Sequence, residues 1–116
     1  MSRIRGGRLY GQLDLLILKI LGRGEPLHGL AIADGILQAS GGELTIEEGA
    51  LYPALHRLQR AGLIQGEWRI STKRYRARFY DLTPKGEKEL TRALAEWTRH
   101  TGAIGRVLGI AWEELS

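Results

Sequence analysis

The sequence predicts a mainly α-helical fold with one small β-hairpin, an arrangement of the α+β class. Three observations predict it: three segments with the apolar spacing of helices come first, two short runs rich in aromatic and branched residues follow, and a long segment with heptad spacing ends the chain. At 116 residues, the chain has the length of one domain with a single modest core.

The first two helices are predicted from apolar runs that end in glycine. Residues 13–21 are almost entirely apolar and are followed by Gly22 and Gly24, so we expect a buried helix that ends in a glycine-rich loop. Beyond Pro26, residues 28–40 place leucine, isoleucine and alanine at helical spacing, and two further glycines end this shorter helix.

The third helix is predicted from a capping pattern and a leucine repeat. Thr45 and Glu48 are spaced as a capping box, in which each side chain bonds the other residue's backbone amide. We therefore expect the helix to begin near Ile46 and to stop at the Ala-Gly pair that ends with Gly62. Pro53 lies inside this helix, where a proline removes one backbone hydrogen bond at a cost of about 3 kcal/mol.

A β-hairpin with a basic tip is predicted next. Residues 63–70 and 76–82 are rich in aromatic and branched side chains, and the short polar connector of residues 71–75 joins them. Thr83 and Pro84 then open another helix, with the threonine as cap and the proline at the first helical position, where its missing amide removes no bond.

The C-terminal segment has a heptad seam sustained for about three repeats. Its residues are Leu90, Leu94, Trp97, Thr101, Ile104, Leu108 and Ala111. A helix over residues 84–112 would be about 43 Å long at 1.5 Å per residue, too long to bury this seam against its own domain, so we expect a second copy of the chain to cover it. Gly102, Gly105 and Gly109 weaken a helix, so a break near Gly102 and a lone helix packed within its own chain remain alternatives.

The order helix, helix, helix, hairpin, long helix is the layout of a winged helix-turn-helix with a further terminal helix. The second and third helices form the turn unit, and the hairpin is the wing. We assign residues 1–83 to a winged helix-turn-helix DNA-binding domain and residues 84–116 to a C-terminal dimerisation helix.

Positive charge gathers on the third helix and on the hairpin. Residues 56–80 contain seven arginines or lysines against one acid, Glu67, whereas the whole chain has a formal net charge of +4. Such a surface is expected for a polyanionic partner, which in this layout is double-stranded DNA. At 100° per residue, the outer side of the third helix and its flanks hold Gly49, Ala50, Tyr52, Pro53, His56, Arg57 and Arg60. We predict that these residues contact DNA, together with Lys73, Arg74, Arg76 and Arg78 of the hairpin.

The outer face of the third helix changes along its length. Gly49 and Ala50 are small and allow a partner to approach the backbone, while the arginines farther along can form forked contacts to guanine or phosphate. We hypothesise that Pro53 bends the helix and so sets how its start enters a major groove. The alternative is a proline that is merely tolerated near the beginning of a helix.

Four stretches of the chain carry a recognisable pattern: LDLLILKIL, PLHG before the second helix, EEGALYPALHRLQRAGLI, and YDLTPKGEKEL after the basic hairpin. In these stretches, from about Leu13 to Leu90, the chain resembles the PadR family of bacterial transcriptional regulators. The resemblance implies a homodimeric winged-helix repressor of a pseudo-palindromic operator, with a single C-terminal helix supplying most of the dimer interface. Leu30 departs from the pattern, because many relatives have an aromatic residue there.

The resemblance also implies control by a small molecule, commonly an aromatic one. Trp97 lies near the middle of the seam, so in a symmetric dimer two indoles could flank a planar ligand. Ordinary aromatic packing between the two helices is the alternative. No cofactor and no metal is expected.

An enzyme and a protein- or RNA-interaction module are the rival functions. His28, His56 and His100 belong to no nucleophile–base motif or paired metal spacing, so we expect no catalysis and place His28 at the start of the second helix in a capping or packing role. A winged-helix module without operator specificity has no need for a basic tip and a basic helix face together. The chain lacks cysteine, an apolar run of the ~20 residues of a membrane span and a secretory core after its basic start, so the cytoplasm is the expected location.

Overall fold

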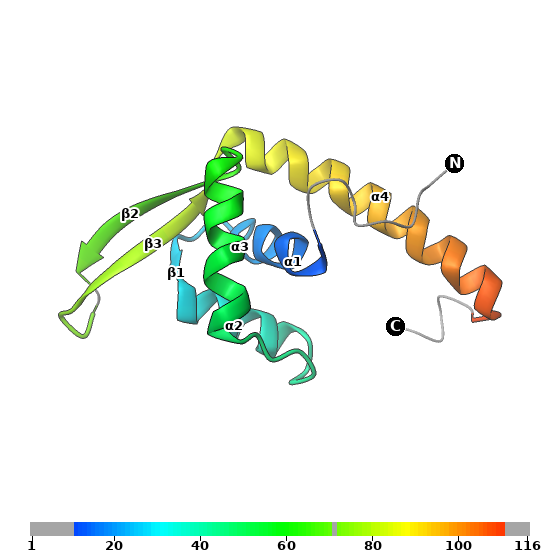
Figure 1. The fold of residues 1–116 in the computed structure, drawn as a ribbon, viewed down its shortest axis with the longest axis horizontal. Helices are drawn as coiled ribbons and strands as arrows, with labels where there is room; N and C mark the ends of the chain where they lie inside the picture. The colour runs from blue at the N-terminus through cyan, green and yellow to red at the C-terminus, as the bar shows by residue number, and fades with distance from the viewer. Residues whose placement is uncertain (1–10, 71, 111–116) are drawn as a thin grey trace.

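The computed structural model describes residues 11–70 and 72–110 and confirms the α+β class. Its elements, in chain order, are α1 (Gln12–Leu21), β1 (Leu27–His28), α2 (Gly29–Ala39), α3 (Glu48–Arg60), β2 (Ile64–Ile70), β3 (Arg76–Leu82) and α4 (Pro84–Leu108). Figure 1 shows α1, α2 and α3 packed as one body, with the β2–β3 hairpin projecting from one side and α4 running away on the other. The three helices and the hairpin form a winged helix-turn-helix.

The hydrophobic core lies where α1 meets the other elements. α1 packs against α2, α3, α4 and β3, which requires apolar side chains on most of its circumference. The largest fully buried apolar side chains are Ile17, Leu18, Leu21, Ile32, Leu51, Leu55, Leu58, Leu63 and Ile64. Full burial of one such side chain stabilises the fold by about 1.5–3 kcal/mol. The three leucines of α3 in this core fix which side of that helix is left for solvent.

A two-residue strand, β1, precedes α2 and is not evident in the sequence pattern, because two residues are too few to show alternation. The sheet is antiparallel in the order β1–β3–β2, with Leu27 opposite Tyr80 and His28 opposite Phe79. The Nδ1 atom of His28 accepts a hydrogen bond from the Ala31 amide at 3.2 Å, and its ring meets the Phe79 ring edge-on, with the centroids 5.5 Å apart. The expected capping or packing role of His28 is confirmed.

The start of α3 differs from the expected capping box. The helix begins at Glu48, and its N-cap residue, Glu47, makes no side-chain cap bond. Thr45 is exposed and lies before the helix. Ile46 instead packs against the core that contains Leu51, and these two residues occupy the positions of a hydrophobic staple. The prediction of a capping box was wrong because burial of Ile46, rather than a side-chain cap, determines where the chain enters α3.

Glycines end α3 and α4 in the same way. After α3, Gly62 has a φ of +78°, and the next amide bonds back to the Leu58 carbonyl at 3.0 Å. After α4, Gly109 has a φ of +76°, and the next amide bonds back to the Gly105 carbonyl at 2.8 Å. Both ends are Schellman motifs, which need a residue that tolerates a left-handed backbone. The predicted stop of α3 is confirmed, and α4 continues past Gly102 without a break.

The first half of α4 packs on the body and the second half leaves it (Figure 1). The helix begins as predicted, with Pro84 in its first turn and the Thr83 hydroxyl accepting a bond from the Gly86 amide at 3.0 Å. Ala93 is buried, and Leu90 packs against the core. Within the described residues, no helix has both the length and the apolar character that crossing a membrane requires.

Candidate nucleic-acid interface

The outer face of α3 is exposed, as the helical spacing predicts. Leu51, Ala54, Leu55 and Leu58 are buried, so the opposite side of the helix faces solvent. The exposed residues there are Gly49, Ala50, Tyr52, Pro53, His56, Arg57 and Arg60. Small residues therefore lie near the start of α3, and hydrogen-bond donors lie farther along.

Pro53 is the sixth residue of a continuous helix. Because proline has no N–H, the carbonyl of Gly49 lacks its helical donor. Both residues are exposed, so water can solvate that carbonyl and the proline ring displaces no core side chain. This placement explains why α3 accepts a proline in its interior; an effect of Pro53 on DNA recognition stays a prediction.

Arg57 is held by a buried carboxylate. Its Nη2 atom donates to Oδ1 of Asp14 on α1 at 2.7 Å. The side chain of Asp14 is 1% exposed, whereas that of Arg57 is 53% exposed. Arg57 thus pairs with a buried carboxylate and also places positive charge on the surface. The position of Arg57 along α3 predicts only its exposure to solvent.

Tyr52 lies against the start of α2. Its ring fills the space beside Gly29, so that a Cβ atom on that glycine would lie 2.8 Å from the phenol oxygen. Partial burial raises the pKa of Tyr52 above its usual value, and the nearby Glu48 and Tyr80 add to the effect. The phenol therefore stays protonated at neutral pH and can donate a hydrogen bond to an anionic partner.

One face of the hairpin carries two arginines stacked on a tryptophan. Trp68 lies opposite Arg78 in the pairing of β2 with β3. The guanidinium carbons of Arg76 and Arg78 lie 4.8 and 5.8 Å from the centroid of the Trp68 ring. Such cation–π contacts order the arginine side chains. Arg69 belongs to the opposite face by strand alternation and pairs with Glu67 at 2.7 Å. The positive charge of the hairpin is therefore greater on the Trp68 face.

A half-open hollow of about 370 Å³ lies between α3 and this face of the hairpin. Its lining residues are Tyr52, His56 and Gln59 of α3 and Trp68, Arg78 and Tyr80 of the hairpin. Three of the predicted DNA contacts, from two separate elements, thus meet in one place. Helix and hairpin form a concave surface, in which aromatic side chains are interleaved with donors.

Eight of the eleven predicted contacts lie outside the lining of this hollow, and three exposed cations are among them. Lys73 and Arg74 are exposed at the tip of the hairpin, where Arg74 adopts a left-handed φ of +65° as the chain turns. Arg60 is exposed at the last residue of α3. These cations extend the basic surface on both sides of the hollow.

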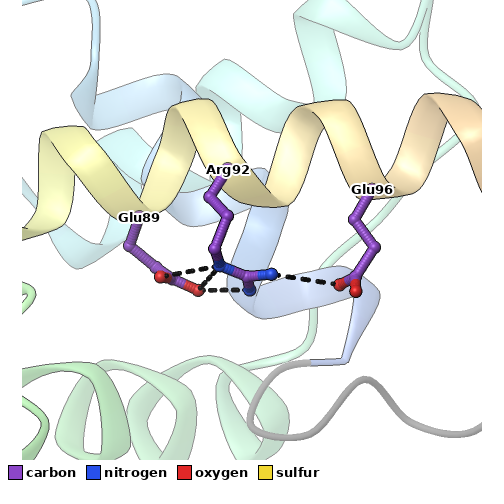
Figure 2. A network of polar contacts seen from close by, with 3 residues as sticks. All are labelled: Glu89, Arg92 and Glu96. Carbon is purple, nitrogen blue, oxygen red and sulfur yellow. Dashed lines mark hydrogen bonds and ion pairs between the residues drawn. The ribbon is translucent and has the colours of Figure 1, made fainter.

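A central part of α4 has its charges neutralised within the helix. Figure 2 shows Arg92 between Glu89 and Glu96. The Nη2 atom of Arg92 lies 2.6 Å from Oε2 of Glu89, and its Nη1 atom lies 3.5 Å from Oε1 of Glu96. Hydrogen bonding to Glu89 raises the pKa of Arg92 above its usual value. A cation flanked by two carboxylates attracts DNA weakly, so this part of α4 does not extend the basic surface.

The residues of the predicted dimer seam fall into two groups. Leu90, Leu94 and Thr101 are partly buried, and Leu90 contacts the core of its own chain. The distal residues Trp97, Ile104 and Leu108 are 42%, 40% and 64% exposed. Val107, which the heptad spacing does not include, is 86% exposed, and Ala111 lies outside the described residues. Within the described chain, an apolar surface on the distal half of α4 is left uncovered.

Three residues of the interface escape sequence reasoning. Asp14 is recognisable in the sequence only as the one acid of a largely apolar helix, and the pattern does not indicate its distant partner. Trp68 has the spacing of an ordinary strand residue. Gly29 has no local signal at all, because the reason for a glycine there is the ring of Tyr52, 23 positions away.

Comparison with known proteins identifies relatives along most of the chain. The profile of the transcriptional regulator PadR-like family matches residues 17–92. A transcriptional regulator from Clostridium thermocellum is 30% identical, with a TM-score of 0.73 over 81% of this chain and 90% of that one. A PadR family transcription regulator from Clostridium difficile is 28% identical, with a TM-score of 0.71 over 84% of this chain and 99% of that one.

Two further relatives match over shorter parts of their length. The transcriptional regulator Rv3488 of Mycobacterium tuberculosis is 46% identical over 57 residues, so the match spans 47% of this chain and about half, 52%, of that protein. Bacillus subtilis PadR, solved in complex with operator DNA, is 28% identical, with a TM-score of 0.63 over 72% of this chain and 46% of that one. These relatives are transcriptional regulators and not enzymes, which confirms both the family resemblance and the expectation of a non-catalytic protein. The chain belongs to the PadR-like family of transcriptional regulators.

Proposed function

We propose that the protein is a homodimeric transcriptional repressor that binds a pseudo-palindromic operator in the cytoplasm. One observation carries the proposal: the exposed face of α3 and the Trp68–Arg78 face of the hairpin border the same hollow. Helix and wing therefore offer DNA one concave surface of aromatic side chains and hydrogen-bond donors, with Arg78 inside it and further cations outside its lining. The start of α3 enters the major groove, while Arg60 and the hairpin cations hold backbone phosphates or reach into the minor groove.

The second half of α4 supplies the dimer interface in this proposal. The exposed apolar side chains there are Trp97, Ile104, Val107 and Leu108. Pairing of this segment with the same segment of a second copy buries them and follows the two-fold symmetry common to homodimers. The two α3 helices then face DNA about 34 Å apart, one turn of the duplex. A dimer bound over a promoter would block polymerase, which favours repression.

A planar aromatic effector is the proposed release signal. Trp97 is 42% exposed in the single chain, so pairing of two copies would bring two indoles together at the interface, with a flat ligand between them. Because the chain has three tryptophans, Trp97→Phe assigns any fluorescence change to this position. A titration with planar aromatic compounds should quench Trp97 and lower DNA affinity together; unaltered fluorescence and affinity would leave ordinary aromatic packing as the role of Trp97.

DNA binding is tested by footprinting the purified protein on the region upstream of its own gene, followed by gel-shift titration at several salt concentrations. Arg60→Gln and Arg76→Gln should each weaken binding and reduce the salt slope by about one. Lys19→Gln is the matched control, because it removes one exposed charge from α1. Binding that is indifferent to salt, or that prefers RNA or a protein partner, would favour an interaction module without operator specificity.

Dimerisation is tested by analytical ultracentrifugation. Leu108→Asp places a charge on the exposed apolar surface of α4 and should yield a monomer with much weaker operator binding, because both half-sites must be held together. Ala95→Asp is the control: Ala95 is exposed on the same helix but lies off the seam. A monomeric unaltered protein at micromolar concentration would contradict the dimer.

A further inference from the structure

Asp14 occupies an unusual place in the fold. It lies in the first turn of α1, and among the described residues it is the charged side chain that belongs to the buried interior. Its Oδ1 atom accepts the bond from Arg57, whereas its Oδ2 atom is buried and has no hydrogen-bond partner within the described part of the chain. Within the described chain, Arg57 is thus the one side chain that hydrogen-bonds this carboxylate, which the amino end of α1 also stabilises.

Stability alone does not explain this arrangement. Removing a carboxylate from water is unfavourable, and one hydrogen bond to a half-exposed arginine compensates for it incompletely. An apolar residue of similar volume commonly does as well or better inside a protein. The neighbours of Asp14 along α1 are leucines, so such a residue would suit the position. A role for the carboxylate in orienting Arg57 accounts for its presence.

The partner, Arg57, lies on the surface that we assign to DNA. It is the tenth of the 13 residues of α3, and 53% of its side chain is exposed. A guanidinium carries five N–H donors in a rigid fork, so the bond to Asp14 leaves the outward donors available. Recognition helices read bases mainly through their N-terminal residues, whereas residues farther along reach the backbone. The position of Arg57 therefore suits a phosphate.

We propose that Asp14 is a positioning residue for DNA binding: its buried carboxylate holds Arg57 in one orientation, from which the exposed edge of the guanidinium contacts a backbone phosphate of the operator. This inference rests on the proposed DNA-binding function. Because α1 also packs against α4, the same bond fixes the phosphate contact of α3 relative to the helix that carries the dimer surface. A non-specific complex, which needs no fixed register, gains little from this alignment.

The test compares operator affinity with affinity for random-sequence duplex, using the full chain. Asp14→Asn nearly preserves the shape of the side chain but removes its charge, and Glu25→Gln removes the same charge from an exposed loop residue as a control. We expect Asp14→Asn to weaken operator binding about tenfold and to leave random-duplex binding unchanged or stronger, because the protein becomes more positive. Glu25→Gln should leave the ratio of the two affinities unchanged.

A second pair of variants identifies the group through which Asp14 acts. Arg57→Ala should weaken operator binding and reduce the salt slope by about one, and Arg57→Lys should not restore it, since lysine lacks the fork. Asp14→Leu combined with Arg57→Ala should bind no more weakly than Arg57→Ala alone, because both changes remove one shared contact. Circular dichroism and urea denaturation check that each variant is folded.

The outcomes separate this inference from the proposed function. If the unaltered protein binds the operator and Asp14→Asn binds it equally well, the positioning role is wrong while the function stands. Equal losses for operator and random duplex would make Asp14 a structural residue only. An unaltered protein that binds no duplex overturns both.

Discussion

Replacing Pro53 by alanine should stabilise the fold and weaken operator binding. Pro53 deprives the Gly49 carbonyl of its helical donor, and both residues are exposed, so the change restores one hydrogen bond without disturbing the core. One backbone bond contributes about 1 kcal/mol net, and the full propensity difference between proline and alanine in a helix interior is about 3 kcal/mol. We therefore expect the free energy of unfolding to rise by about 1–3 kcal/mol.

The loss of affinity follows from a change in the path of α3. If Pro53 sets the direction of the first turn of α3, straightening the helix misaligns the Gly49 end in the groove, and loss of one good base contact costs about 1–3 kcal/mol, or roughly fivefold to 160-fold in affinity. Urea denaturation measures stability, and gel-shift titration on the footprinted fragment measures affinity. Thr91→Ala is the control, since it should raise the helix propensity of α4 at an exposed position without touching α3. If stability and affinity rise together in Pro53→Ala, the reasoning on helix shape is refuted.

Substitutions at three further positions test local contacts that the structure shows. Gly86→Ala should lower the free energy of unfolding by about 2 kcal/mol, because the new Cβ atom would overlap the Leu63 carbonyl oxygen. The better helix propensity of alanine offsets only part of this loss. A variant that is more stable in urea denaturation would contradict the close packing of Gly86 on Leu63. Thr83→Ala removes the N-cap side chain of α4 and should lower the free energy of unfolding by about 1 kcal/mol, whereas Thr83→Ser keeps the hydroxyl and should retain most of the stability. Equal losses of stability in these two variants would exclude capping as the cause. Gly29→Ala should displace the Tyr52 ring, which tyrosine NMR shifts would report, and lower operator affinity in gel shifts; an unmoved ring would show that the backbone yields instead.

Long apolar or spaced patterns made most of the fold predictable. The apolar run of α1, the spaced leucines of α3 and the aromatic and branched runs of β2 and β3 each extend over seven residues or more, which exceeds what chance supplies. The capping box failed because a four-residue motif carries little information beside the burial of Ile46. β1 is two residues long, and it exists because β3 offers it an edge, a fact of tertiary structure.

The sequence was sufficient to predict the exposed faces of α3 and of the hairpin, but not the contacts that their side chains make. Spacing along α3 gives the side on which Arg57 lies, but the carboxylate that holds it is 43 positions away. In the same way, a basic hairpin is visible in composition, whereas the stacking of two arginines on Trp68 depends on strand register. The glycines of α4 suggested a break near Gly102, yet the helix continues to Leu108 and ends where Gly109 turns left-handed.

β1 supports the β2–β3 hairpin at its base and, in the described part of the chain, leaves the outer part of the hairpin without a third strand. Within the described residues, β1 pairs with β3 at Phe79 and Tyr80 and no farther along the strand, so the outer part of the hairpin has two strands, which is the least stable form of sheet. The base is joined to α2 through His28, which caps that helix. In the proposed DNA complex, the outer ribbon, with Lys73 and Arg74 at its end, should therefore bend more readily than the base to follow a wide or a narrow groove.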